Sequence, residues 1–341
     1  MSHLPPEGCL RTSSHNPESG LILRGLAALT TLSAVWAGGL RAQAAIDPNV
    51  APRAAALERS GERQMAIDML GRYLATAPDD GRAWFQLGRF YLLDARDWHL
   101  QGHRGDPDGL LYLDFAATAF DQAVRLAVDS SVVYRGLAEL ERSVVLVEDS
   151  GWSIGGASGP PADAPEMPGF IVELGANLLS SCPAGGVLLV GTDLEALSVW
   201  YDDGDLRTRE ILPLRPDRYA TDSVYRRRMA EAMGTAPGLP VRNALADVAA
   251  RRTLCLTPTA DGAAAPPIVW TPFRLTRVSR AVDAGPDALS LTELLEATRQ
   301  GGSVWLRDVR GVYDSAARFN ALLCSSLLLV FGDTPPPACR P

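Results

Sequence analysis

The chain contains no lysine, so all 32 basic residues among its 341 are arginines. Without lysine there is neither a phosphate-binding loop ending in Gly-Lys-Ser/Thr nor a Schiff-base nucleophile. Histidine is scarce as well, with four in the chain and none after His103. Beyond that residue, a Ser-His-Asp or Cys-His catalytic site is therefore close to excluded.

What remains is the composition of an ordinary globular protein. Hydrophobic residues make up 47% of the chain and charged residues 21%, which is typical of folded domains. The length is enough for two domains, each with its own core. The net charge of −8 argues against nucleic acid and anionic lipid as partners, because an acidic chain repels both.

Residues 1–44 are typical of an export signal. Arg11 and Arg24 supply positive charge, the run 25–40 carries no charge, and Ala42-Gln43-Ala44 forms a small-x-small cleavage site. We expect cleavage before Ala45 and a periplasmic or extracytoplasmic location. An uncleaved anchor, which would leave the protein membrane-associated, is the alternative, although a span needs about 20 apolar residues.

Four of the five cysteines lie beyond the signal segment, namely Cys182, Cys255, Cys324 and Cys339. An even number of cysteines in an exported chain indicates disulfides. Of the three possible pairings we favour Cys324 with Cys339, which would tie the tail to the last helix, and Cys182 with Cys255 beside two strands. Free buried thiols are the alternative, because cysteine is common in protein cores.

Helical periodicity and an internal repeat mark residues 45–148. Small and apolar residues recur at matching intervals, first at Ala66, Leu70, Tyr73 and Pro78, then at Ala116, Phe120 and Ala123. Trp84 to Tyr91 reads Trp-x-x-Leu-Gly-x-x-Tyr, and the units begin 34 residues apart at Asp47 and Gly81. This pattern resembles the tetratricopeptide repeat family. The resemblance implies closely paired helices and an extended surface for protein partners.

The second repeat unit departs from the family pattern. Residues 94–110 add roughly 16 residues between its helices and include Trp98, His99 and His103. We expect a solvated insertion, because a polar stretch outside the repeat pattern typically forms a loop. A third unit begins near Ser131 and runs out after Val147, so we expect this short array to lean on the second domain.

A second domain is predicted at 170–332, after a Gly-, Pro- and Ser-rich linker at 149–169 and before a Pro-rich tail at 333–341. Helical and strand patterns alternate in it. This alternation predicts a small, mainly parallel α/β domain of three layers, similar to a Rossmann fold. The predicted strands are 187–190, 210–214 and 253–257, with edge-like strands at 268–270 and 273–278.

Helices of this domain are predicted from periodicity and from capping boxes. Thr192 to Glu195 and Ser290 to Glu293 each combine a hydroxyl residue with a glutamate three positions later, which favours a helix start. One continuous helix is expected over 221–233, and 303–331 is expected to be largely helical. The last helix is rich in leucine, which favours a buried core over a docking surface.

Residues 170–257 carry a second resemblance. Gly185 to Glu195, Val199-Trp200-Tyr201, Arg215-Pro216-Asp217 and Tyr225 are similar to the soluble C-terminal region of bacterial protein mannosyltransferase-like membrane proteins. The family has an Asn-Gly-Asp-Asn-Asp-like turn where this chain has Val190 to Glu195, and the membrane-embedded part is absent. The resemblance therefore implies a fold and no activity.

The strongest catalytic candidates are Asp193 and Glu195, at the carboxyl end of the first predicted strand. Two carboxylates there could carry out acid–base chemistry on a glycosidic bond or hold a divalent cation. The alternative is structural, since Glu195 suits a helix cap and Asp193 suits the helix dipole.

The remaining candidates are binding residues. His99 and His103 have the spacing of metal ligands on a helix, but Gly102 and Gly105 argue against a continuous helix, so no metal site is predicted. Trp98 in the same insertion is a candidate partner contact. Arg226 and Arg227 lie in an arginine-rich stretch that suits an anionic group, with ion pairing on a solvated face as the alternative.

The histidine-poor inventory favours binding over catalysis. We therefore expect an exported, non-enzymatic scaffold or accessory subunit that contacts protein partners, including those of a membrane-bound assembly. No cofactor, nucleic acid or small-molecule ligand is expected. The alternative is a protein that binds or processes carbohydrate or lipid-linked sugar through Asp193 and Glu195.

Overall fold

The computed structural model describes residues 46–101, 107–150, 159–161, 164–202, 209–282, 289–332 and 334–340. The predicted signal segment and His103 lie outside them, as do parts of the predicted linker and tail. Within the described residues, no helix has both the length and the apolar character needed to cross a membrane.

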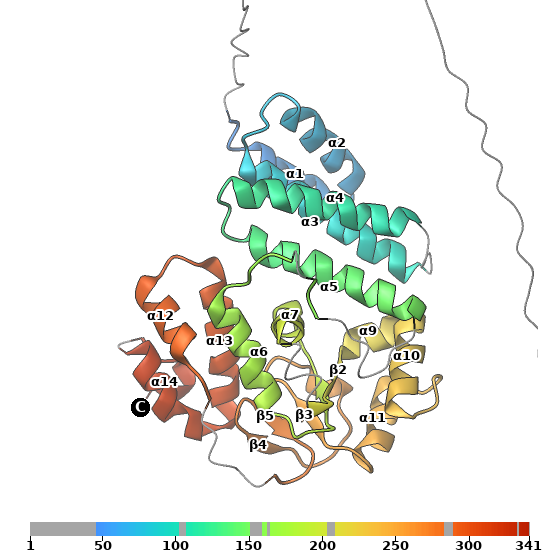
Figure 1. Ribbon diagram of the computed structural model, residues 1–341, viewed down its shortest axis with the longest axis vertical. Coiled ribbons are helices and arrows are strands. Elements are labelled where there is room, and N and C mark those ends of the chain that lie inside the picture. The colour runs from blue at the N-terminus through green and yellow to red at the C-terminus, as the bar shows by residue number, and fades with distance from the viewer. Residues whose placement is uncertain are drawn as a thin grey trace, which may run out of the picture. The chain divides into compact units, whose positions relative to one another are not determined.

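The first five helices form a helical region with the paired arrangement of tetratricopeptide repeats (Figure 1). They are α1 (Val50–Arg59), α2 (Arg63–Leu74), α3 (Gly81–Leu100), α4 (Pro107–Arg125) and α5 (Ser131–Ser150). Gly88 permits the close pairing of α3 with α4, because a Cβ there would lie 2.7 Å from the ring of Phe120. The Trp84 indole donates to the Pro78 carbonyl at 2.7 Å and so fixes the turn between the pairs.

The expected solvated insertion is wrong for the described part of 94–110. Helix α3 continues to Leu100 and α4 begins at Pro107, so most of the extra residues lengthen the two helices. His99 is only 3% exposed. The Trp98 and Tyr112 rings lie in contact, with centroids 6.1 Å apart. The physical reason is that Leu92, Ala95 and His99 continue the buried stripe of α3 at helical spacing.

The second region holds a five-stranded sheet of order β2-β1-β3-β5-β4. Its strands are β1 (Val187–Leu189), β2 (Leu212–Leu214), β3 (Leu254–Leu256), β4 (Thr271–Phe273) and β5 (Thr276–Val278). Strands β2, β1 and β3 are parallel, with Val187 opposite both Leu212 and Leu254. Strands β5 and β4 add an antiparallel hairpin at one edge, so the sheet is mixed. The predicted three-layer α/β architecture is confirmed.

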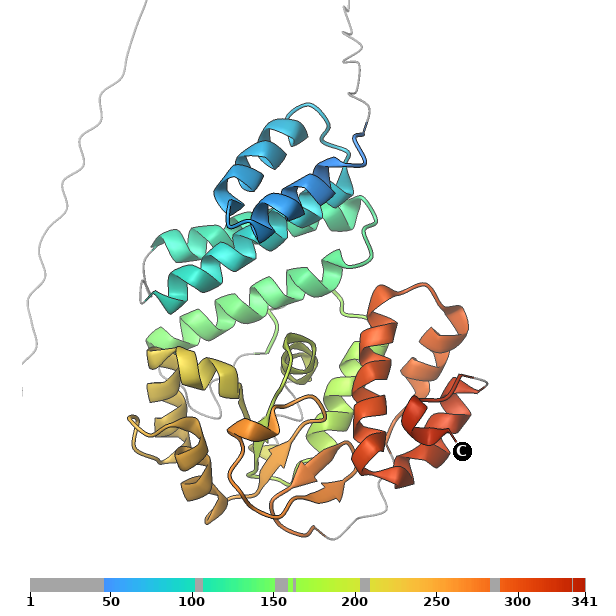
Figure 2. The same cartoon turned by 180° about the vertical axis from the view of Figure 1, so that it is seen from behind.

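Two helical layers cover the two faces of this sheet (Figures 1 and 2). Leu188 and Cys255 face one layer, and their neighbours Val187, Leu189 and Leu254 face the other, as the two-residue period of a strand requires. The first layer contains α6 (Gly169–Ser180), α7 (Asp193–Tyr201), α12 (Thr292–Gln300), α13 (Val304–Phe319) and α14 (Cys324–Phe331). The second contains α9 (Pro216–Thr221), α10 (Ser223–Met233) and α11 (Val241–Ala249).

One buried cluster extends through both the helical and the α/β region, and all described residues belong to a single compact unit. Leu137 and Ala138 of α5 belong to the same buried cluster as Leu194 and Leu197 of α7. The expectation that the short array leans on the second region is therefore confirmed.

One local prediction is corrected, and the bounds of two others are refined. Residues 268–270 form no strand, because the Ile268 amide donates back to the Pro266 carbonyl in a tight turn; β4 starts at Thr271. The helix expected over 221–233 is present as α10, but it starts at Ser223, because the Asp222 side chain accepts from the Val224 and Tyr225 amides and caps it. The expectation that 303–331 is largely helical is confirmed, with a break at Asn320 between α13 and the short helical turn Ala321–Leu323 that leads into α14.

The second capping box does not form as predicted. No side chain of the segment itself caps α12. The cap comes from Glu173 of α6, whose carboxylate accepts from the Glu293 and Leu294 amides at 3.1 and 2.9 Å. Ser290 donates its hydroxyl to the same carboxylate at 2.7 Å.

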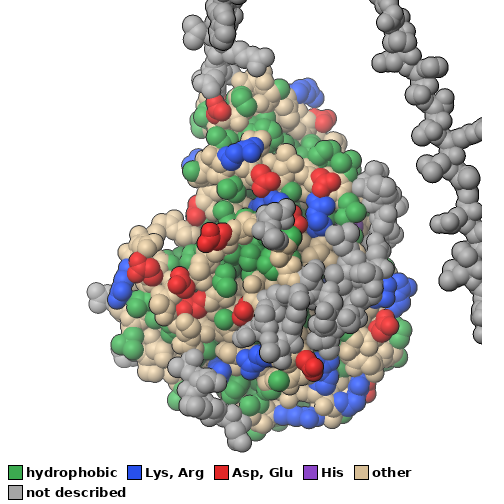
Figure 3. All heavy atoms as spheres, in the orientation of Figure 1, with side chains coloured by type: hydrophobic (Ala, Val, Ile, Leu, Met, Phe, Trp, Pro, Cys, Tyr) green, Lys and Arg blue, Asp and Glu red, His purple; other side chains and the backbone are tan. Residues whose placement is uncertain are grey.

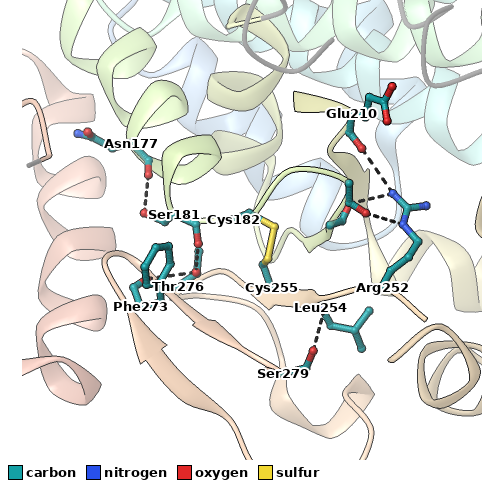
Figure 4. The surroundings of a disulfide bond; sticks show 12 residues. Asn177, Ser181, Cys182, Glu210, Arg252, Leu254, Cys255, Phe273, Thr276 and Ser279 are labelled. Carbon is teal, nitrogen blue, oxygen red and sulfur yellow. Dashed lines mark hydrogen bonds between the residues drawn. A yellow bond between two sulfur atoms is a disulfide. The ribbon is translucent and has the colours of Figure 1, made fainter. Parts of the chain in front are cut away.

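The amino ends of the parallel strands are fastened together (Figure 4). A disulfide joins Cys182, after α6, to Cys255 in β3. Arg252 precedes β3, and its guanidinium donates to the carbonyls of Gly185 and Gly186 before β1, at 2.6 and 3.0 Å. It also reaches the Glu210 carbonyl before β2, at 3.5 Å. One side chain thus links the starts of all three parallel strands.

A second disulfide joins Cys324 to Cys339, so both favoured pairings are present. It ties α14 to residues of the predicted tail. The leucine-rich end of the chain is only partly core, since Leu327 and Phe331 are buried while Leu322 and Leu329 are more than 80% exposed.

Candidate functional site

The carboxyl ends of β1 and β2 lie against helices α3 and α5 of the helical region. Helix α7 begins at Asp193, shortly after β1 ends at Leu189, and α9 begins at Pro216, shortly after β2 ends at Leu214. Open α/β sheets bind ligands at this edge, and here the strand order changes direction between β1 and β3. In this chain, charged side chains from both the helical region and the α/β region lie at this edge of the sheet.

Asp193 bridges the two regions. Its carboxylate accepts from Arg96 of α3 at 3.0 Å and from Arg215 after β2 at 2.6 Å. Burial alone would raise the pKa of Asp193, but the two guanidinium groups outweigh it and hold the pKa below its ordinary value. The residue is therefore a charged member of an ion-pair network at neutral pH.

The Glu195 side chain is fully buried, and other groups of the chain donate hydrogen bonds to its carboxyl group. Its carboxylate accepts from the Gly191 amide at 3.0 Å, from the Thr257 hydroxyl at 2.7 Å and from the Thr259 hydroxyl at 2.6 Å. Gly191 allows this arrangement, because a Cβ there would lie 2.4 Å from the backbone of Ala260. The Thr192 hydroxyl accepts from the Glu195 amide, as the capping box predicts, but the Glu195 carboxylate binds Gly191 and the Thr257 loop.

Glu141 of α5 is the second centre of the network. It is 5% exposed, and Arg218 donates to both of its oxygens at 2.8 and 3.0 Å. Arg96 approaches at 3.5 Å and His99 Nδ1 at 3.6 Å. Burial would raise the pKa of Glu141, yet the guanidinium of Arg218, together with the neighbouring His99 ring and the Arg96 guanidinium, holds that pKa well below its ordinary value. On the face drawn in Figure 3, acidic and basic side chains lie interspersed, as in paired networks.

Two cavities adjoin this network, and both are lined by Arg96 and Asp193. The smaller, which we name the junction pocket, has a volume of about 230 Å³ and lies among Glu141, His99 and the apolar side chains of Val144 and Trp200. The larger, which we name the groove, has a volume of about 580 Å³ and runs between α3, α5, α13 and the start of α7. Each cavity combines walls from both regions.

Arg89 gives the groove a positive charge. Its guanidinium stacks 5.7 Å from the ring centre of Tyr134 and reaches the Gln86 amide oxygen at 3.4 Å. Among the described residues it pairs with no carboxylate. Arg96 and Asp193 neutralise each other, and Arg307 contacts Asp308 at 3.3 Å. The groove wall therefore carries one uncompensated cation next to aromatic and aliphatic side chains.

The sequence-predicted residues do not form one site. Asp193 and His99 line the cavities, whereas Trp98, Arg226 and Arg227 line neither, and His103 lies outside the described residues. Within the described part of the chain, no group of three or more His, Cys, Asp or Glu residues is placed to hold a metal ion.

Sequence reasoning missed Arg89, Arg96 and Glu141. The signal was present for Glu141, because Leu137, Ala138 and Glu141 form one buried stripe of α5 and a charge in such a stripe calls for a partner. Arg96 follows Leu92 and Ala95 on α3 in the same way. Nothing in the local sequence identifies Asp193, 97 residues away, as that partner.

The model of the tetratricopeptide repeat family matches residues 51–90, which cover α1, α2 and the first half of α3. No curated protein and no solved structure matches the chain. Nothing therefore supports the resemblance of residues 170–257 to mannosyltransferase-like proteins. A repeat of this family implies protein partners in general, and the two disulfides suggest an oxidising, extracytoplasmic location. The chain thus carries a tetratricopeptide repeat joined to an α/β region.

Proposed function

We propose that this protein is an exported, non-enzymatic scaffold that holds a segment of a partner protein in the groove. Three observations support the proposal: the repeat at residues 51–90, the two disulfides and the groove itself. Repeat arrays commonly present such concave surfaces to protein partners.

The groove is the observation that carries the proposal. Its volume of about 580 Å³ lies within the range of pockets that bury a ligand. Arg89 supplies a cation, while Tyr134 and Trp305 supply aromatic surface, which is the composition of interface hot spots. A partner segment with an acidic side chain next to apolar side chains would therefore complement the groove, because the acid could pair with Arg89 and the apolar side chains could pack on the aromatic rings.

The carbohydrate-processing alternative has less support. Asp193 is paired with two arginines, and Glu195 is fully buried and accepts from four donors. A general acid needs a proton at neutral pH, and the lowered pKa of Asp193 opposes that role.

A groove-blocking substitution tests the proposal. Gly311 of α13 lines the groove, and nothing lies within 4 Å of a Cβ built there. Gly71 of α2 has equally open space but lies outside the groove. Gly311→Phe should therefore fill the groove without strain, and Gly71→Phe is the matched control.

The measurement is site-specific photo-cross-linking of the full chain in its native compartment. The cross-linking residue replaces Arg307, which is 88% exposed on the groove wall, or Arg72 of α2 as control. We expect a defined protein neighbour from position 307 that is absent from position 72. It should disappear with Gly311→Phe and remain with Gly71→Phe. A neighbour that persists in the Gly311→Phe chain contradicts the proposal.

A further inference from the structure

The junction pocket has the size of a single aromatic ring. Its volume is about 230 Å³, and its apolar walls include Leu140, Val144 and Leu214. A protein cavity of about 150 Å³ is enough to bind benzene. One substituted ring therefore fits, whereas most ligands of drug or disaccharide size need a larger site.

The charges around this pocket are already paired. Glu141 binds Arg218 and Arg96, Asp193 binds Arg96 and Arg215, and the latter also pairs with Asp217 at 2.8 Å. A charged occupant would bring a desolvated charge without a partner, which costs free energy. The pocket therefore favours an uncharged group.

One buried polar atom on the pocket wall has no hydrogen-bond partner within the described residues. His99 is 3% exposed, and its Nδ1 is 3.6 Å from the nearest Glu141 oxygen, beyond hydrogen-bond distance. An oxygen about 2.8 Å from both atoms would close that gap, because this is the ordinary length of such a bond. A hydroxyl suits the position, since it donates to the carboxylate and accepts from the ring N–H.

We propose that the junction pocket binds a tyrosine side chain of the partner segment, with the phenol hydroxyl between His99 Nδ1 and Glu141. The proposal rests on the proposed function, because Arg96 and Asp193 line both cavities and place the pocket beside the groove. The apolar walls of the pocket would pack against the tyrosine ring. The paired charges around the pocket disfavour an ionised group. The His99 nitrogen, which has no partner within the described residues, favours a group that carries a hydroxyl. A phenylalanine side chain would leave that nitrogen unpaired.

The test compares N-acetyl-tyrosinamide with N-acetyl-phenylalaninamide by calorimetric titration of the full chain. We expect the tyrosine compound to bind about tenfold more tightly, as a hydrogen bond to a charged group provides. Val144→Trp, which fills the pocket, should abolish binding of both. Val269→Trp, at a valine that is 85% exposed elsewhere, should leave both affinities unchanged.

The histidine variants separate the hydroxyl contact from simple filling. His99→Leu should reduce the tyrosine preference to about threefold or less, since the hydrogen bond is lost. His99→Asn, whose amide stands where Nδ1 was, should retain it. Circular dichroism confirms that each variant is folded. Equal binding of the two compounds, binding that survives Val144→Trp, or no binding at all overturns the proposal. Cross-linking from position 307 tests the groove independently.

Discussion

The amino and carboxyl edges of the parallel strands are held by different chemistry. At the amino edge the Cys182–Cys255 disulfide and Arg252 join elements within the α/β region, and the acceptors of Arg252 are backbone carbonyls. At the carboxyl edge Asp193 and Glu141 join the α/β region to the helical region through arginines. The first edge depends on covalent and backbone contacts, and the second depends on charge.

Because the two edges are held by different contacts, we expect them to respond differently to a change of pH. A fastening by disulfide and backbone is insensitive to moderate changes of pH, so the amino edge is suited to maintaining the fold. The ion pairs of Asp193 and Glu141 are lost only in acid, and both residues line the junction pocket, so acid is expected to weaken the carboxyl edge before the amino edge. The following predictions separate the two edges.

The largest effect is expected from removing the amino-edge disulfide. Cys182→Ala with Cys255→Ala opens a link across 73 residues, for which loop entropy predicts a loss of about 4 kcal/mol of unfolding free energy. The matched control, Cys324→Ala with Cys339→Ala, opens a link across 15 residues and should cost about 3 kcal/mol. Urea unfolding followed by circular dichroism measures both. Equal losses would show that loop length does not decide the effect.

Breaking the carboxyl edge at Glu141 should rank next. Glu141→Gln keeps the shape but removes the negative charge that Arg218 and Arg96 share, and such a loss costs about 3 kcal/mol when the remaining charges are buried. Glu62 is exposed and forms no ion pair within the described residues, so Glu62→Gln is the control. The same urea titration applies. A stability equal to that of the control would mean that the network does not hold the two regions together.

Acid should weaken the carboxyl edge selectively. The pKa values of Glu141 and Asp193 are lowered in the folded chain, so their contribution is complete above about pH 4.5 and is lost as the pH falls through the folded-state values. Each extra proton bound on unfolding gives a slope of about 1.4 kcal/mol per pH unit. Unfolding free energies measured from pH 6 downward test this. The Glu141→Gln chain should show a shallower slope than the wild type, and an unchanged slope would contradict the assignment.

The smallest effect on stability is expected from filling the groove. Gly311→Phe and Gly71→Phe should each change the unfolding free energy by less than about 0.5 kcal/mol, because both positions have open space. Thermal unfolding measures the change. A large loss in Gly311→Phe alone would show that the groove wall is strained by the added ring, and its cross-linking result would then lose its meaning.

The strands and helix pairs were predictable because their signals are local. The apolar run that forms β1 and the Trp84 motif of the repeat each occupy a few adjacent residues. The observed pairing of the cysteines was the favoured one, from where they lie relative to predicted elements, with free buried thiols as the alternative. By contrast, Glu173 caps α12 by accepting from the Glu293 amide, 120 residues away, and no local sequence pattern indicates this contact.

The candidate site was predicted only in part for the same reason. Asp193 was found because the end of a parallel strand marks a ligand edge. Its partners Arg96 and Arg215 come from elements before and after it, and only the folded chain brings them together. His99 was singled out as a binding residue, but in an insertion that proved to be helix, so its neighbour Glu141 could not be named from the sequence.

Glu195 has a consequence for how the α/β region relates to ligand-binding sheets. Its carboxylate lies between the ends of β1 and β3, at the point where open sheets of this kind hold the anionic part of a bound molecule. The chain thus fills this position with the carboxyl group of its own side chain. Truncation at this position would leave the Gly191 amide and the hydroxyls of Thr257 and Thr259 around an empty place of carboxylate size, which formate is small enough to fill. The place where related sheets bind a ligand is therefore occupied in this chain by the buried Glu195 side chain.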